Sequence, residues 1–389
     1  MIRMAKPTQE TTTLQIARDH VEPLIATLGI VRNELAPLFD LPPESAGTKT
    51  AATAWWQKLS EEQKYPFRSA LAALAAPQLV VDIGINAKNE RLTNTHAVIP
   101  SMRWNDPIFL LAAENDGAQF RLEYLKQADL FTNTLLLYLD GGATLHEMEM
   151  KFEVAVRDFA VLLATADLRQ KLRFQALINH DVFPDSLQAG DVASMIGEAF
   201  AIADPRWLLP FCLPVLHLSA DSFTPATVGQ SLDNLVKLGL MKKNGDLVTL
   251  TEPGEAFAES VSERISSLGI DTYGVDAAGN HGRQSVLFIR GANFLWYAGV
   301  GGTAPDSIVV TSIGLDQAEK VLQELFTPVA APKPSASGAT ATAVPPVAQA
   351  AAPAFSKAPS GKIKKFCPSC GTAIKPGKKF CSNCGGKIE

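Results

Sequence analysis

Apolar residues recur at three- and four-residue spacing along several stretches of the chain, and this spacing gives a helix one buried face. Ser60 and Gln63 form an N-cap pattern ahead of one such stretch, because each side chain can hydrogen-bond the other residue's backbone N–H. A short helix is also expected just before Leu41-Pro42-Pro43, where the prolines stop it. The predicted helices cover 14–28, 31–39, 61–75, 127–139, 150–179, 255–268 and 316–326.

Other stretches are short and apolar and are bounded by turn residues, which is typical of strands. Asn115-Asp116-Gly117 and Gly291-Ala292-Asn293 each separate two of them and predict hairpins. The predicted strands cover 79–85, 96–100, 107–113, 118–125, 285–290, 294–300 and 307–314. Helices with antiparallel strands predict an α+β protein in two loosely similar halves, 1–180 and 181–326. Whether the two halves are a true duplication stays open.

Two details of the body concern burial. Trp296 and Tyr297 are adjacent on a predicted strand, so they point to opposite faces of a sheet. The sequence favours coverage of both faces by helices over an exposed aromatic anchor for a partner. Cys212 lies in the apolar run FCLPVLHL and is expected to be a buried, small hydrophobic residue.

The composition changes abruptly after residue 326. Residues 327–362 contain seven prolines and twelve alanines, no acid and no apolar period that could form a core. Such a composition predicts a flexible linker. The formal net charge of −5 divides unevenly, because residues 361–389 carry +6 and residues 1–326 carry −13. An acidic body repels nucleic acid and anionic membranes on average, although a local basic patch stays possible.

Four cysteines lie in the basic tail, in two Cys-x-x-Cys pairs separated by ten residues: Cys367, Cys370, Cys381 and Cys384. Two such pairs can close a tetrahedral site of four thiolates around one structural Zn²⁺ ion. A segment of this size cannot fold on apolar burial alone, so metal binding would supply about 10–16 kcal/mol of folding free energy. The predicted domain covers 363–389, and about 364–389 of it resembles the short prokaryotic zinc-ribbon family.

Alternative chemistry for these cysteines is less favoured. Disulfides need an oxidising compartment, and a redox Cys-x-x-Cys pair normally sits in a βαβ context that this tail lacks. Four thiolates also fill the zinc coordination sphere, which leaves no position for a catalytic water. The tail's lysines are compatible with phosphate contacts or with docking on an acidic protein surface, including this protein's own body.

Residues 224–259 resemble the recognition helix and wing of bacterial winged-helix domains. Leu232, Leu235 and Leu238 share a helix face, Asn244-Gly245 marks the tip of a two-stranded wing (240–242 with 247–250), and Thr251 is the expected N-cap of the next helix. The preceding helix is compressed to about 220–223. Only Gln230 and Asn234 could face base edges, so protein contact or core packing is favoured over DNA binding. Lys237, Lys242 and Lys243 keep the DNA-binding alternative open.

Signatures of enzymes and membrane proteins are missing. His146-Glu147 lacks the second histidine of a helical zinc-protease motif, and no phosphate-binding glycine loop or nucleophile elbow occurs. No apolar stretch is long enough to cross a bilayer, and residues 1–13 lack the apolar segment of a signal peptide. We therefore expect a cytoplasmic protein without membrane insertion. An enzyme whose active site forms only in three dimensions remains the third hypothesis.

The leading hypothesis is a non-catalytic, zinc-binding adaptor or chaperone-like protein of bacterial type. Its body would hold one protein partner while the tethered ribbon engages another, since a tether raises the effective concentration of the second contact. The arrangement of helices and sheet in two halves is loosely similar to the specificity chaperones of type VII secretion. The alternative is a transcription-associated DNA-binding protein that uses 224–250. Neither reading indicates an oligomeric state.

Overall fold

The computed structural model describes residues 12–33, 35, 45–87, 90–99, 108–114, 118–125, 128–142, 144–202, 204, 206–275, 281–301, 304 and 306–326. The chain divides into two compact units, Met1–Lys333 and Pro334–Glu389, and every described residue belongs to the first. The predicted linker (327–362) and zinc ribbon (363–389) lie outside the described residues. Most of the helix expected over 31–39 does too, and residues 31–33 are not helical.

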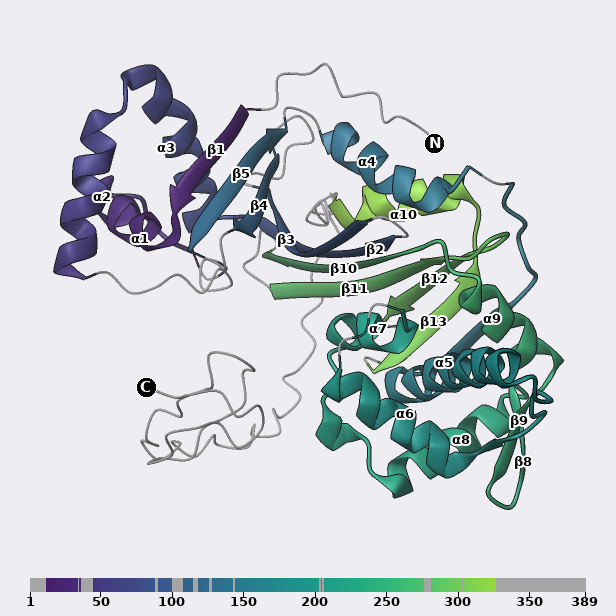
Figure 1. Ribbon diagram of the computed structural model, residues 1–389. Coiled ribbons are helices and arrows are strands. Elements are labelled where there is room, and N and C mark those ends of the chain that lie inside the picture. Colours follow the sequence, from purple (N-terminus) through teal and green to yellow (C-terminus); the bar gives the residue numbers. More distant parts are fainter. Residues whose placement is uncertain are drawn as a thin grey trace, which may run out of the picture. The chain divides into compact units, whose positions relative to one another are not determined.

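One ten-stranded antiparallel sheet runs through the described part of the first unit, in the order β1-β5-β4-β3-β2-β10-β11-β12-β13-β6 (Figure 1). Its strands from the first part of the chain are β1 (Thr12–Ala17), β2 (Leu79–Ala87), β3 (Glu90–Ile99), β4 (Ile108–Glu114) and β5 (Gln119–Leu125). The remaining strands are β6 (Lys151–Ala155), β10 (Ser266–Val275), β11 (His281–Arg290), β12 (Leu295–Val300) and β13 (Ser307–Ser312). The class is α+β, as the sequence predicts.

The sheet consists of two sets of five strands with the same connectivity. In each set an edge strand leads into helices, then four consecutive antiparallel strands follow, and the last of them pairs back with the edge strand. The sets meet where β2 pairs with β10, so the order is the same when it is read from either edge inward. By connectivity, β6 and the helix after it begin the second set. The division into domains at residue 180 stays a prediction.

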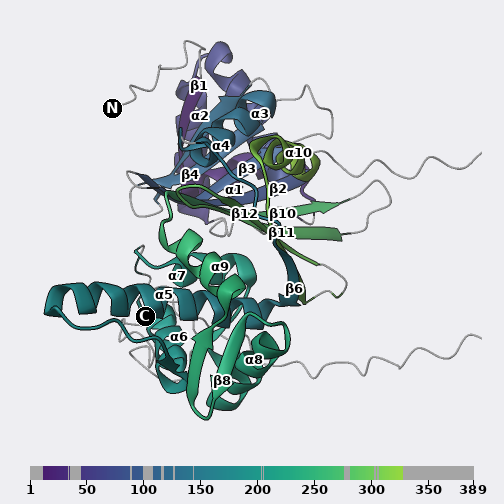
Figure 2. The ribbon, with the colours of Figure 1, turned by 90° about the vertical axis from the view of Figure 1, so that its right-hand side faces the viewer.

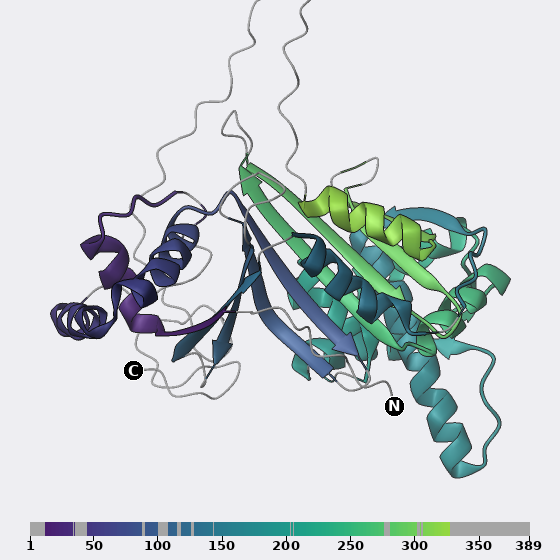
Figure 3. The same cartoon turned by 90° about the horizontal axis from the view of Figure 1, so that it is seen from above.

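Helices cover both faces of the sheet. On one face lie α4 (Ala128–Asp140) and α10 (Leu315–Phe326), which pack on each other and on alternate residues of β2, β10 and β11, as seen from above in Figure 3. On the other face lie α5 (Val156–Asn179) and α7 (Leu208–Leu216). A separate core joins β1 and β5 to α1 (Arg18–Thr27), α2 (Ala46–Lys58) and α3 (Glu61–Ala75). Trp296 is buried and Tyr297 is half-buried in opposite cores, so both sheet faces are covered, as the sequence favours.

A helical module is inserted between β6 and β10. Helices α6 (Ala189–Ala201), α7, α8 (Pro225–Lys237) and α9 (Glu252–Ser262) pack around α5, which runs beneath the sheet in Figure 2. The module also contains the 3-10 turn η2 (Ala220–Ser222) and a second sheet in the order β7-β9-β8. The strands of this sheet are β7 (Leu187–Gln188), β8 (Met241–Asn244) and β9 (Leu247–Leu250).

Local signals placed several elements correctly. The Ser60–Gln63 capping box is present, because the Gln63 amide donates to Ser60 Oγ and the Ser60 amide donates to Gln63 Oε1. The predicted hairpins form as β4–β5 and β11–β12, and the predicted helices over 127–139 and 316–326 form as α4 and α10.

Three predicted helix boundaries are wrong, because in each case part of the predicted helix forms a strand in the structure. Residues 12–17 form β1, residues 151–155 form β6, and residues 266–268 begin β10. The apolar spacing in these segments also suits a strand, and each segment has a neighbouring strand that satisfies its backbone groups. Helix α2 was missed because its alanine- and threonine-rich sequence has little apolar periodicity. Helices α6 and α7 were also missed.

Candidate functional site

The winged-helix-like segment has the predicted elements in the predicted order. Helix α8 buries Leu232 and Leu235, Gly239 and Gly245 adopt the positive φ that their turns require, and β8 pairs with β9 as a short hairpin. The compressed helix expected at 220–223 is the 3-10 turn η2, and α8 packs against both α5 and α6. Thr251 stands at the N-cap position of α9 as predicted, but its hydroxyl donates to the Gly239 carbonyl at 2.5 Å and does not cap the helix.

The two side chains that could read base edges both contact α5. Asn234 Nδ2 donates to Oδ2 of the buried Asp158 at 3.0 Å, and Gln230 Oε1 accepts from Arg157 Nη2 at 3.5 Å. Lys243 of the hairpin forms a 2.7 Å ion pair with Asp233 on the exposed side of α8. An acidic residue at this position opposes the approach of a phosphate backbone. Lys237 and Lys242 remain exposed on the helix and hairpin.

A polar cluster lies at the centre of the large sheet, on the face that α7 covers. Asp271 on β10 and Ser285 on β11 are buried, and His217 follows the last residue of α7 with a φ of 52°. His217 Nε2 lies 3.0 Å from Asp271 Oδ1, and Arg283 Nη2 lies 2.6 Å from His217 Nδ1. The Arg283 guanidinium also stacks 4.8 Å from the centre of the Tyr273 ring.

Burial shifts the pKa of both titratable groups of this cluster in the direction that favours the neutral form. Burial raises the pKa of Asp271 to about 6, and Arg283 and the Ser285 hydroxyl oppose the shift. Burial lowers the pKa of His217 to about 4, and the Arg283 guanidinium adds to that effect. At neutral pH Asp271 is therefore ionised and His217 is neutral. The Arg283 guanidinium contacts both ring nitrogens of His217, and Nε2 also faces Asp271 Oδ1.

Serine, histidine and aspartate also form hydrolytic triads, but the arrangement here is different. A triad places the serine and the aspartate on opposite ring nitrogens. Here Ser285 Oγ and Asp271 Oδ1 both approach His217 Nε2, and Ser285 donates to Asp271. The sequence did not indicate this cluster, because its residues come from three elements far apart in the chain and show no recognisable spacing.

Two further buried groups have structural partners. Asp167 accepts from the backbone amides of Leu208 and Leu209 at 3.0 and 2.8 Å, so it holds the N-terminal end of α7 against α5. Burial raises the pKa of Asp167 to about 6. Cys212 is fully buried, as predicted, and burial raises the pKa of its thiol. A buried thiol that resists ionisation is a poor nucleophile.

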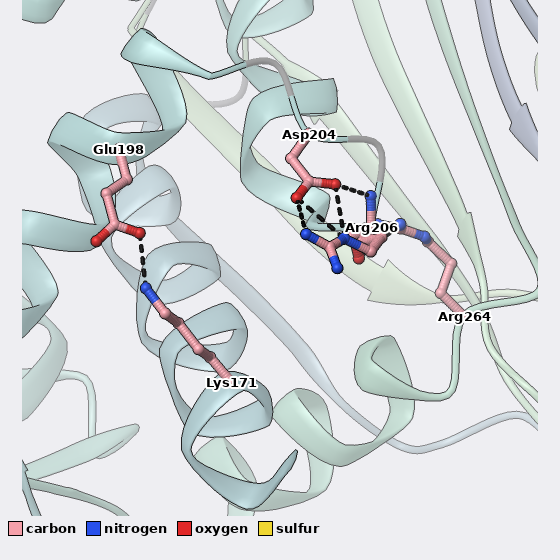
Figure 4. Close-up of polar contacts among 5 residues, drawn as sticks. All are labelled: Lys171, Glu198, Asp204, Arg206 and Arg264. Atoms are coloured by element: carbon pink, nitrogen blue, oxygen red, sulfur yellow. Dashed lines mark hydrogen bonds and ion pairs between the residues drawn. The ribbon is translucent and has the colours of Figure 1, made fainter. Parts of the chain in front are cut away.

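The last part of α5 is exposed, although its first part lies in the core. Large apolar side chains here are accessible to solvent: Phe174 is 49%, Leu177 66%, Ile178 77% and Val182 94% exposed. We call these four residues the apolar stripe. Ion pairs anchor the helix just before it, from Lys171 to Glu198 on α6 at 2.7 Å (Figure 4) and from Arg169 to Glu255 on α9. The stripe extends beyond these anchors.

Comparison with known proteins identifies the tail. Residues 366–388 match the zinc-ribbon domain family, and all four predicted zinc ligands lie within this segment. The tail is therefore a zinc ribbon, which implies a structural zinc ion, and a donor set of four thiols suits tetrahedral zinc. No curated protein matches the chain. Among the described residues, no group of three His, Cys, Asp or Glu side chains is placed to hold a metal, and no helix could cross a membrane.

Proposed function

We propose that the protein is a non-catalytic, zinc-binding adaptor or chaperone-like protein that holds one protein partner with its body and a second with its tethered ribbon. The observation that carries the proposal is the Asn234–Asp158 hydrogen bond, which commits a candidate base-reading side chain to the protein's own interior. A winged-helix unit whose recognition helix is fastened to α5 in this way suits packing and protein contact better than base readout.

The charge distribution supports the same function. The body carries −13 and the tail +6, so the body repels nucleic acid while the ribbon attracts acidic surfaces. In the proposed arrangement Cys367, Cys370, Cys381 and Cys384 hold the zinc ion, which keeps the ribbon folded and leaves its lysines available for a partner. A linker of 36 residues then raises the local concentration of the ribbon near whatever the body holds.

The test is a pull-down of the tagged full-length protein from its native lysate, with half of the sample treated with nuclease. A variant lacking residues 327–389 and the Cys381→Ser variant serve as comparisons. The adaptor proposal expects protein partners that survive nuclease, some of which are lost from both comparison proteins. Recovery of nucleic acid, together with loss of the captured proteins on digestion, would contradict it.

DNA binding remains the second candidate, because Lys237 and Lys242 are exposed on α8 and its hairpin. It expects salt-dependent binding to duplex DNA that is weakened by Lys237→Ala and Lys242→Ala. Binding whose affinity depends neither on salt concentration nor on these two lysines would exclude DNA binding by this segment.

A further inference from the structure

The apolar stripe at the end of α5 points to an interaction surface that the adaptor proposal does not require. On the helix, Phe174, Leu177 and Ile178 follow the three- and four-residue spacing of a single face, and the exposed Val182 lies just beyond the end of α5, after the left-handed His180. Large apolar side chains gathered at one exposed place usually mark a contact with another molecule. Figures 2 and 3 both show this end of α5 extending away from the neighbouring helices.

Charged residues of opposite sign flank the apolar stripe. Basic residues precede it on α5, namely Arg169, Lys171 and Arg173, and Asp181 follows it directly, where its backbone amide donates to the Ala176 carbonyl. Arg169 and Lys171 are engaged by Glu255 and Glu198 of the same chain. Arg173 and Asp181 are both exposed, and neither forms an ion pair with another residue in the part of the chain that the structure describes. Arg173 and Asp181 therefore place opposite charges just before and just after the stripe.

This order is complementary to itself when one copy is reversed. Two α5 ends that lie antiparallel about a two-fold axis near Leu177 place Phe174 of one copy beside Ile178 of the other. The same arrangement brings Arg173 of one copy toward Asp181 of the second copy, just past the end of its α5, and this happens twice in the dimer. Antiparallel helices also oppose their dipoles favourably. A parallel arrangement would place like charges together instead.

We propose that the occupant of the apolar stripe is a second copy of this chain, in a symmetric dimer formed by antiparallel α5 helices with paired Arg173–Asp181 contacts. The stripe is small, so the dimer belongs to the weaker class of interfaces and dissociates on dilution. Dimerisation gives the assembly two bodies and two tethered ribbons.

The test measures the mass of the full-length, zinc-loaded protein by sedimentation or light scattering over about 1 to 100 μM. The wild-type protein is expected to shift from monomer to dimer across this range. Leu177→Glu is expected to raise the dissociation constant at least about tenfold, because Leu177 lies at the centre of the contact. Ile202→Glu changes a comparably exposed residue (64%) outside the stripe and should leave the dimer intact. Thermal melting of each variant confirms that it folds.

Charge reversal tests the orientation. Arg173→Asp alone and Asp181→Arg alone each place like charges together and should weaken self-association. An equimolar mixture of the two variants should instead form heterodimers, since both contacts then pair opposite charges. A wild-type protein that stays monomeric, a dimer that survives Leu177→Glu, or a mixture that associates no better than its components would each overturn the proposal. A monomer that loses a protein partner on Leu177→Glu would assign the stripe to that partner.

Discussion

Asp82 on β2 lies directly opposite Asp271 on β10 in the antiparallel pair that joins the two sets of strands. Directly opposed residues share a face of the sheet, so the two carboxyl groups are neighbours. The proximity of Asp82 adds to the effect of burial in raising the pKa of Asp271. At the sheet centre His217 thus contacts both the Asp271 carboxyl group, which resists ionisation, and the Arg283 guanidinium, and Arg283 Nη2 lies 3.7 Å from Asp271 Oδ2.

We expect Asp271→Asn to change how stability depends on pH. The folded-state pKa of Asp271, about 6, lies above its unfolded value of about 3.9. The contribution of Asp271 to the stability of the folded protein is therefore fully present below about pH 4 and is lost as the pH rises through about 6. The free energy of unfolding of Asp271→Asn minus that of wild type should therefore be higher at pH 7.5 than at pH 4.5, by about 1 kcal/mol after screening by solvent. Urea denaturation at the two pH values measures the difference.

His217→Gln should act in the opposite direction over the same range. The folded-state pKa of His217, about 4, lies below its unfolded value of about 6.5. The wild-type protein therefore loses stability through His217 as the pH falls through this interval. Compared with wild type, His217→Gln should be relatively more stable at pH 4.5 than at pH 7.5. The same denaturation series measures this, and equal slopes for wild type and both variants would contradict the assignment of the cluster.

Gly269→Ala should disturb the packing of α7 on the sheet. A Cβ atom at Gly269 would lie 2.6 Å from Val215 Cγ2, and valine has little rotameric freedom to move away. We expect a loss of about 1–3 kcal/mol in the free energy of unfolding, measured by urea denaturation. Gly84→Ala places its Cβ at an ordinary 3.6 Å from Phe211, and Gly282→Ala meets nothing within 4 Å. Both substitutions should lower the free energy of unfolding clearly less than Gly269→Ala does.

Arg290→Met should destabilise the body strongly. The guanidinium is fully buried and donates to the carbonyls of Leu139 (2.9 Å), Asp140 (3.1 Å), Ala292 (3.0 Å) and Gly291, so it joins the end of α4 to the β11–β12 turn. Methionine leaves these acceptors without their donor, and a loss of about 3 kcal/mol is expected. Arg290→Lys should lose less, because it keeps one cationic donor group.

An exposed arginine supplies the control for Arg290. The Arg206 side chain pairs with the neighbouring Asp204 at the surface (Figure 4), and Arg206→Gln should not measurably change the melting temperature. If Arg290→Met melted like Arg206→Gln, the buried guanidinium would not be holding α4 in place.

Cys381→Ser should unfold the zinc ribbon and leave the body intact. The loss of one thiolate removes most of the folding free energy of the tail, which is about 10–16 kcal/mol in zinc-finger peptides. Metal analysis should show less than one zinc per chain. Amide hydrogen exchange should become fast in peptides from 364–389 and stay unchanged in the body. Cys212→Ser, at a cysteine outside the ribbon, should keep its zinc. Loss of body protection in Cys381→Ser would contradict independent folding.

Elements with a strong local signal could be predicted from the sequence. The Ser60 capping box defined the start of α3, the turn at 115–117 defined the β4–β5 hairpin, and the spacing of apolar residues defined α10. The Cys-x-x-Cys pairs identified the zinc ribbon in the same way. In each case neighbouring residues supply the hydrogen bonds, the turn geometry or the metal ligands, so distant parts of the chain are not needed.

The sequence by itself therefore determined the α+β class, the capped start of α3, the two hairpins, and the ribbon, whose four cysteines lie within one short segment. Tertiary structure alone decided that Leu14 and Ile16 belong to a strand, since β5 supplies the hydrogen bonds that an isolated segment would seek in a helix. It also decided the junction of β2 with β10 and the cluster of His217 with Asp271. These contacts join residues far apart in the chain, and their energies depend on burial that no local pattern records.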